Sequence, residues 1–308
     1  MIELPPDHEL AQITDWVETS CLFGRRGGVS KSDIEDALGE QTEEQPEEIA
    51  ADVWEEIDRR SSLCGEGYPV DSGLARVRRR GPWTDFLPYT FLLSISCARH
   101  YRLWIEDRPA RLLDGVYPER VFGHAVAIAL EGYLDGCALR FDSPREPPVP
   151  SAYDEAVGFV AGRIDEEIGK VPTYREDPKD EHLDVIGWIP FSDRRPGKLI
   201  VLVQCATGTR WEDKLTELDT HAWSKYIDWP RDPLKAFALP FVIPEGDGDP
   251  DLWMYSSVHG GIILDRLRLT SCLGRASSRG GRFSQTTMVA ESMRATTEAL
   301  AKQLPWSN

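Results

Sequence analysis

The sequence lacks several signatures that would place it in a familiar class. Its 6 cysteines contain no CxxC pair, which argues against a zinc ribbon and a disulfide framework. No apolar run reaches the ~18 residues of a membrane-spanning helix, and the first residues, MIELPPDHEL, have neither the basic start nor the apolar run of a signal peptide. We therefore expect a cytoplasmic protein with reduced cysteines and no membrane partner.

Histidine-based chemistry also has no signature in the chain. The 6 histidines show no HxxxH or HxH spacing, and no motif for Ser-His-Asp or Cys-His catalysis is recognisable. The histidines are best interpreted as isolated residues.

Basic residues are scarce relative to acidic ones. The chain has 35 Lys and Arg against 52 Asp and Glu, a formal net charge of -17. Such a protein repels nucleic acid at long range, so DNA contact requires a local basic patch or a more basic partner. The densest basic run contains Arg76, Arg78, Arg79 and Arg80, and both a solvated loop and a phosphate-binding segment remain open for it.

The residues that are present indicate a packed α/β protein. Of 308 residues, 41% are hydrophobic and 10 are Trp, enough for one large domain or two smaller ones. Helical periodicity predicts helices at 7–22, after Ser30 and at 49–60, then longer apolar helices at 83–105 and 119–136. We expect an N-terminal helical region, residues 1–115, and an α/β core, residues 116–308. The second and third helices are interpreted as plain packing units in preference to a DNA-reading pair.

The most informative stretch is residues 184–214. Asp184 leads the apolar run Val185-Ile186-Gly187-Trp188, and a turn then leads to a second apolar strand that ends in Gln204 and Cys205. Gln204 is thus a polar side chain at the end of a hydrophobic row. Helical spacing predicts a helix from Trp211 to Ala222, and further strands are predicted at 235–243 and 261–269.

The order helix, strand beginning with Asp, strand ending in a polar residue, helix, strand resembles the PD-(D/E)XK nuclease superfamily over about residues 120–270. The stretch QCATGTRWEDKL is also similar to a set of prokaryotic restriction-endonuclease-like proteins. The resemblance implies a restriction-endonuclease-like mixed central sheet flanked by helices, after the N-terminal helical region. It further implies a Mg²⁺- or Mn²⁺-dependent DNA endonuclease, of the kind that acts as an effector of prokaryotic anti-phage defence.

The resemblance assigns a role to particular residues. Asp184 falls on the metal-binding aspartate, Gln204 on the position of the second acid, and the carbonyl of Cys205 would be a third oxygen ligand. Mg²⁺ held by such oxygens would activate water, and a Lys would orient or deprotonate that water.

Two positions depart from the family pattern. The usual lysine position is Ala206, so Lys214 on the following helix is the expected substitute, with Lys198 less favoured. The acid from the preceding helix would be Glu131 or, from the next helix, Glu155. Gly123 stands where a glutamate was expected.

These departures keep a second hypothesis open, namely a non-catalytic interaction protein that keeps the nuclease fold as a scaffold. Asp184 alone is also explained as a strand-end cap, and Gln204 as a buried amide satisfied by a backbone group. Under either hypothesis we expect weak, salt-dependent DNA binding and a homodimer or a larger complex. The contact is expected through the N-terminal helices or an apolar surface around Trp223, Tyr226 and Trp229.

Overall fold

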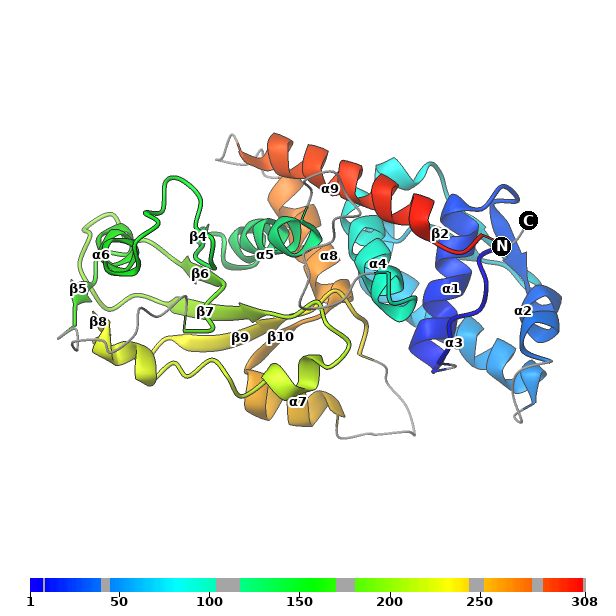
Figure 1. The fold of residues 1–308 in the computed structure, drawn as a ribbon, viewed down its shortest axis with the longest axis horizontal. Helices are drawn as coiled ribbons and strands as arrows, with labels where there is room; N and C mark the ends of the chain where they lie inside the picture. Colours follow the sequence, from blue (N-terminus) through cyan, green and yellow to red (C-terminus); the bar gives the residue numbers. More distant parts are fainter. Residues whose placement is uncertain are drawn as a thin grey trace.

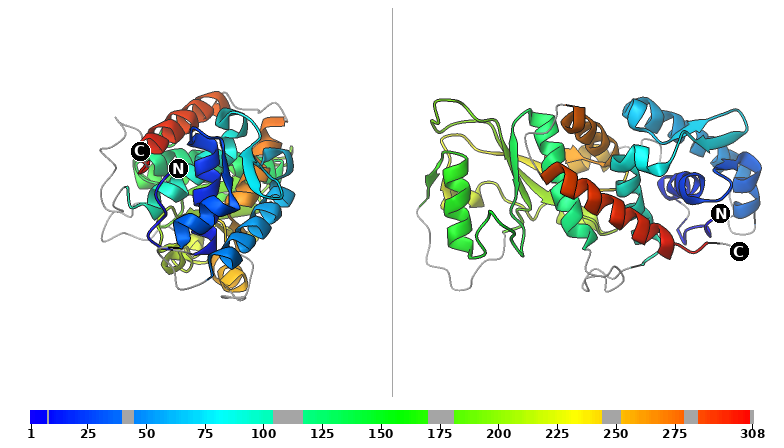
Figure 2. Two further views of the ribbon diagram at one scale, coloured as in Figure 1. Left: turned by 90° about the vertical axis from the view of Figure 1, so that its right-hand side faces the viewer. Right: turned by 90° about the horizontal axis from the view of Figure 1, so that it is seen from above.

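The computed structural model describes residues 1–7, 9–39, 45–103, 117–169, 181–243, 252–278 and 285–306. The molecule is elongated, with the central sheet at one end, the first three helices at the other, and α4, α5, α8 and α9 between them (Figure 1). Figure 2 shows that the last helix runs back from the sheet to the N-terminal region.

The helices and strands follow one another along the whole chain. The helices are α1 (Leu10–Phe23), α2 (Lys31–Leu38), α3 (Pro46–Cys64), α4 (Leu87–His100), α5 (Pro118–Leu134), α6 (Tyr153–Arg163), α7 (Leu252–Gly260), α8 (Arg266–Ser278) and α9 (Gln285–Gln303). The strands are β1 (Gly28–Ser30), β2 (Val70–Ser72), β3 (Arg76–Arg79), β4 (Cys137–Arg140), β5 (Glu167–Ile168), β6 (Val185–Trp188), β7 (Ile200–Cys205), β8 (Ile227–Asp228), β9 (Leu234–Ala238) and β10 (Ile262–Leu264).

The central sheet is mixed, as the family resemblance implied. Its strand order is β10-β9-β7-β6-β4; β4, β6 and β7 are antiparallel, whereas β9 and β10 run parallel to β7. One face packs on α4, α5, α8 and α9 through Val185, Val201 and Val203. The other packs on α6 and its neighbours through Ile186 and Leu202. This alternation follows from the two-residue period of a strand.

The N-terminal region has its own small sheet and core. β1, β3 and β2 form an antiparallel sheet beside α1, α2 and α3. Ser30 caps α2, because its hydroxyl accepts from the Asp33 N–H while the Asp33 carboxylate accepts from the Ser30 N–H. The basic run lies in the small sheet, because residues Arg76–Arg79 form strand β3. The interpretation of this run as a loop was wrong.

Two further predictions of secondary structure are corrected. The strand predicted at 261–269 ends at Leu264, because the Asp265 carboxylate accepts the Arg268 N–H and caps the start of α8. The helix predicted from Trp211 consists of two 3₁₀ turns, Trp211–Lys214 and Ala222–Lys225.

The apolar surface proposed for partner contact is interior. Trp223, Tyr226 and Trp229 are buried in the core beneath the sheet with Phe141 and Tyr153. Their ring contacts, such as Phe141 with Trp223 at a centroid distance of 5.6 Å, stabilise that core.

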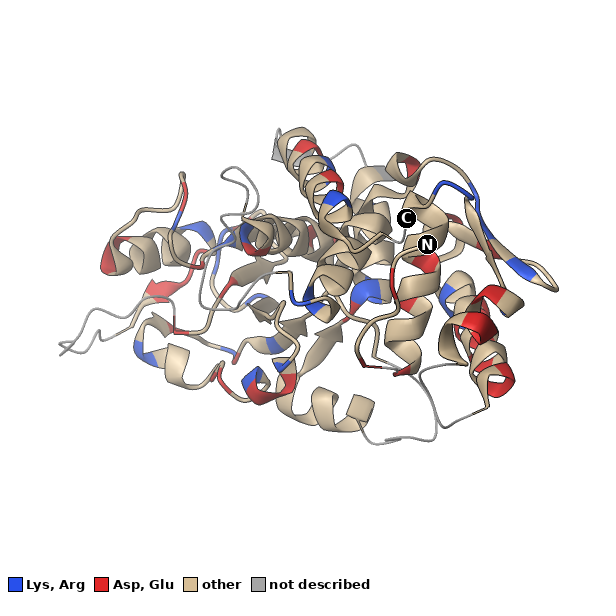
Figure 3. Cartoon of the chain, turned by 45° about the vertical axis from the view of Figure 1, so that its right-hand side comes forward, with Lys and Arg blue, Asp and Glu red and all other residues tan. Residues whose placement is uncertain are grey.

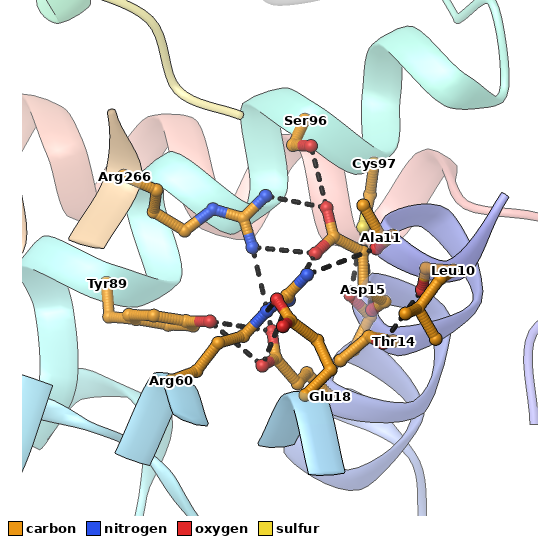
Figure 4. A network of polar contacts seen from close by, with 12 residues as sticks. Leu10, Ala11, Thr14, Asp15, Glu18, Arg60, Tyr89, Ser96, Cys97 and Arg266 are labelled. Atoms are coloured by element: carbon orange, nitrogen blue, oxygen red, sulfur yellow. Dashed lines mark hydrogen bonds and ion pairs between the residues drawn. The ribbon is translucent and has the colours of Figure 1, made fainter. Parts of the chain in front are cut away.

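A buried group of charges joins the N-terminal helices to α8 (Figure 4). This Asp15 cluster consists of Asp15 and Glu18 on α1, Arg60 on α3 and Arg266 on α8. Arg266 donates to both oxygens of Asp15 at 2.8 and 2.6 Å, and Arg60 donates to Asp15 at 2.7 Å. Two tyrosine hydroxyls, from Tyr68 and Tyr89, donate to Glu18.

The pKa values of the two acids of this cluster are shifted in opposite directions. Burial alone would raise the pKa of Asp15, but Arg266 and Arg60 lower it well below its ordinary value of 3.8. Burial raises the pKa of Glu18, and the nearby charge of Asp15 raises it further against the influence of Arg60. The cluster therefore favours an ionised Asp15.

Candidate functional site

Asp184 lies just before β6, between the ends of β4 and β7. Its Oδ2 accepts the Cys205 N–H at 2.6 Å. Its backbone N–H donates to Val203 at 3.0 Å, and its carbonyl accepts the Phe141 N–H at 2.7 Å. Asp184 therefore ties β4, β6 and β7 together at this end of the sheet, which we name the Asp184 end.

Gln204 lies directly across from Asp184, because Val185 pairs with Val203 in the antiparallel register. Its side chain is 4% exposed. Nε2 donates to Glu217 Oε2 at 2.6 Å, and Oε1 accepts the Leu218 N–H at 3.3 Å. The amide thus holds the segment that follows β7.

The two side chains come from facing positions on neighbouring strands, but each is used by a different part of the fold. The Asp184 carboxylate accepts the Cys205 N–H. The Gln204 amide leaves on the face that carries Leu218. Burial raises the pKa of the Cys205 thiol, and the nearby carboxylates of Asp184 and Asp142 raise it further.

A pair that the sequence analysis missed fills the space beside Asp184. The guanidinium of Arg140, at the end of β4, donates to Asp142 Oδ2 at 2.7 Å and lies 2.5 Å from Oδ1. Glu146 is also 3.4 Å from Arg140. The signal was the Arg-Phe-Asp sequence after an apolar strand, because residues i and i+2 share a face.

Gly123 on α5 explains why Arg140 fits. A Cβ on Gly123 would lie 3.3 Å from Arg140 Nε. The helix position where the resemblance called for an acid therefore carries no side chain, and a guanidinium packs against it. A fixed positive charge occupies the neighbourhood in which a metal ion was expected.

The expected helix acid lies elsewhere. Glu131 Oε1 accepts the Ala138 N–H at 3.4 Å, and Ala138 pairs with Gly187, roughly 10 Å along β6 from Asp184. Burial raises the pKa of Glu131 to about 7. Glu155, the alternative, is exposed on α6.

The contacts of the two candidate lysines do not involve Asp184. Lys214 is exposed at the end of its 3₁₀ turn. Lys198 is buried, donates to the carbonyl of Ile164 and lies 3.4 Å from Asp165 Oδ2.

The donor set does not fit Mg²⁺ as arranged. Within the described ranges, no group of three or more His, Cys, Asp or Glu side chains is placed to hold a metal ion. Of the predicted ligands, Asp184, Gln204 and Cys205 meet at one strand end, whereas Glu131 does not join them. Oxygen-rich Mg²⁺ sites require several ligands in near-octahedral positions.

The basic run forms an exposed stripe on the β2–β3 hairpin, which Figure 3 shows beside the acidic N-terminal helices. Arg78 and Arg79 are exposed, while Arg80 pairs with Glu66 at 2.9 Å. The neighbouring α3 carries exposed acids at Glu47, Asp52, Glu55 and Asp58. A further arginine, Arg275, is exposed on α8.

The fold and this site define a mixed α/β protein with a strand-end acid and an N-terminal helical region. Comparison of the chain with protein-family models, curated proteins and solved structures finds no match. No helix in the described part of the chain is both long and apolar enough to cross a membrane.

Proposed function

We propose that the protein is a restriction-endonuclease-like scaffold without catalysis, which works as an interaction subunit of a larger complex. One observation carries the proposal: the polar side chains of the Asp184 end are engaged in contacts that hold the fold together. Asp184 holds a backbone N–H, Gln204 holds the segment after β7, and Arg140 neutralises Asp142.

The order of elements supports the fold part of this proposal. α5 precedes β4, β6 begins after Asp184, β7 ends after Gln204, and β9 follows parallel to β7. This is the order from which the resemblance was drawn, except that 3₁₀ turns stand in place of the second helix. This order supports a nuclease-like scaffold whose polar residues stabilise the sheet.

The contact surface in this proposal is the N-terminal region. The exposed acids of α3 form an acidic helix face, and the chain as a whole carries a charge of -17. Complementary charge favours a basic partner surface and suppresses direct DNA binding. A second copy of the chain would place two acidic faces in repulsion, so we favour a different protein over a homodimer.

Calorimetric titration of Mg²⁺ and Mn²⁺ tests the proposal. Wild type, Asp184→Ala and the exposed control Asp213→Ala should all lack saturable binding. Saturable binding by wild type and the control, lost only in Asp184→Ala, contradicts the scaffold. Light scattering of the isolated protein then gives its oligomeric state.

The second candidate is a Mg²⁺-dependent DNA endonuclease. It is favoured by the position of Asp184 directly opposite Gln204 and by the two carboxylates, Asp184 and Asp142, that flank Cys205. Plasmid cleavage lost in Asp184→Ala and Lys214→Ala, but kept in Lys302→Ala, would support it. Equal cleavage by all of these proteins would indicate a contaminant.

A further inference from the structure

A cavity lies on another part of the molecule, away from the Asp184 end. It has a volume of about 560 Å³ and is lined by residues of α3, α5, α7, β10 and α8. None of its lining residues belongs to the Asp184 end. We name it the α3–α8 cavity.

The cavity concentrates positive charge in an acidic protein. Its charged lining consists of Arg59, Arg268 and Arg275 against the single acid Asp265. Arg59 is paired with Glu56 at 2.6 Å, so Arg268 and Arg275 supply the excess. Asp265 is buried and turned toward α8, where it accepts the Arg268 N–H. With a whole-chain charge of -17, this local excess of guanidinium groups is a feature that favours an anionic ligand.

The arginines of α8 form one continuous stripe. Arg268, Ser271 and Arg275 are spaced by three and four residues, so they share a helix face. All three are exposed. Planar guanidinium groups bind phosphate oxygens through paired N–H donors, and a serine hydroxyl adds a further donor.

Flat apolar surface lies beside the stripe. The Arg268 guanidinium stacks over the Trp253 ring at 4.5 Å from its centroid. Tyr133 is 44% exposed and Leu63 is 54% exposed, and both line the cavity. Aromatic faces of this kind bind nucleobases by stacking.

We propose that the α3–α8 cavity binds a nucleotide, with its phosphate on Arg268 and Arg275 and its base against Trp253 and Tyr133. The volume lies within the range of about 300–1,000 Å³ typical of small-molecule sites. Two kinds of ligand carry both a phosphate and a base: a free nucleotide and the phosphorylated 5′ end of a DNA strand. The cavity is independent of the Asp184 end, so its function does not require metal-dependent cleavage there.

Calorimetric titration with defined probes tests the site. AMP, adenosine, inorganic phosphate and a 5′-phosphorylated oligothymidylate are each titrated into wild type, Arg268→Gln, Arg275→Gln and Trp253→Leu. The matched control is Arg294→Gln, which removes an exposed arginine from α9. Circular dichroism and urea unfolding verify that each variant is folded, and Arg275→Gln serves where Arg268→Gln is destabilised.

The expected result is saturable binding of AMP to wild type and the control, tighter than that of adenosine or phosphate. Loss of one charged hydrogen-bond donor should weaken AMP binding about tenfold or more in either arginine variant, and Trp253→Leu should also weaken it. Preference for the oligonucleotide, lost in the same variants, would identify a strand end as the source.

Two results would overturn the proposal. One is absence of AMP and oligonucleotide binding to wild type, or equal binding by wild type and both arginine variants. The other is phosphate binding as tight as that of AMP and unaffected by Trp253→Leu, which would leave an anion site without nucleotide recognition.

Discussion

The Asp15 cluster and the Asp184 end both bring acids and arginines together from distant parts of the chain, but they are completed to different degrees. In the Asp15 cluster the side chains of Arg60 and Arg266 are 0% exposed, and each meets both Asp15 and Glu18. At the Asp184 end, Asp142 has one guanidinium, Arg140, and Asp184 accepts a backbone N–H.

The difference separates two uses of charge. Buried ions are costly to desolvate, so they persist only where partners satisfy them fully. The Asp15 cluster is such a closed set, and removing one member leaves a buried charge without compensation. The partly exposed acids at the Asp184 end carry a smaller penalty, and changes there should alter stability less.

Breaking the closed cluster should have the largest effect. Arg266→Met removes the guanidinium that holds both oxygens of Asp15 and should lower the free energy of unfolding by about 3–5 kcal/mol. Urea unfolding at pH 7 measures it, with Arg294→Met as the exposed control. A loss below about 1 kcal/mol, the range of exposed ion pairs, would show that the cluster is not rigidly paired.

Gln204→Leu should have a smaller effect. It keeps the approximate size of the side chain but leaves the Leu218 N–H without its acceptor, which should cost about 1–3 kcal/mol. The control Lys214→Gln, on the exposed turn of the same segment, should stay near wild type. Equal stability of all three proteins would mean that the amide is not structural.

The Asp184 end allows a sharper comparison between two substitutions. Asp184→Ala removes the acceptor of the Cys205 N–H and should cost about 1–3 kcal/mol, whereas Asp184→Asn keeps an oxygen there and should cost less. Urea unfolding and hydrogen exchange of the Cys205 amide follow the two variants. If Asn is as damaging as Ala, the negative charge itself is required.

The effect expected at Glu131 differs from the others because it depends on pH. Burial raises its folded-state pKa from 4.5 to about 7, so the folded protein disfavours the ionised form. Wild-type stability should therefore decrease as the pH rises from 4.5 to about 7 and then level off, and Glu131→Gln should lack this decrease. Urea midpoints at pH 4.5, 6 and 8 measure the difference, and parallel profiles for the two proteins would contradict it.

Local patterns predicted much of the fold. Ser30 and Asp33 predicted the start of α2, and the two apolar runs predicted β6 and β7 as neighbouring strands joined by a turn. The mixed sheet between helices was implied by the family resemblance. The interpretations of Asp184 as a strand-end cap and Gln204 as a satisfied amide agree with their hydrogen bonds.

Local patterns gave wrong secondary structure where an aspartate side chain bonds nearby backbone N–H groups and ends a helix or strand. Helical spacing from Trp211 continues to Ala222, but the Asp219 carboxylate accepts the N–H groups of His221 and Ala222 and breaks the run into turns. Asp265 likewise ends β10 and starts α8. Aspartate before an apolar run was a capping signal that strand-like alternation concealed.

Non-local pairing could not be predicted at all from one sequence. Arg140 and Gly123 come from β4 and α5, and their fit depends on how the helix crosses the sheet. The pairing of Arg266 could not be predicted either. In the sequence it alternates with Leu267 as a strand residue would, but in the structure its side chain pairs with Asp15 in the N-terminal region.

The ion pair between Asp15 and Arg266 also bears on how the protein is made. The two residues are 251 positions apart, so a ribosome that adds roughly 5–20 residues per second completes Arg266 on the order of ten seconds or more after Asp15. Until then, Arg60 is the one arginine of the cluster that can pair with Asp15. The Asp15 cluster is therefore completed only after α8 has been synthesised.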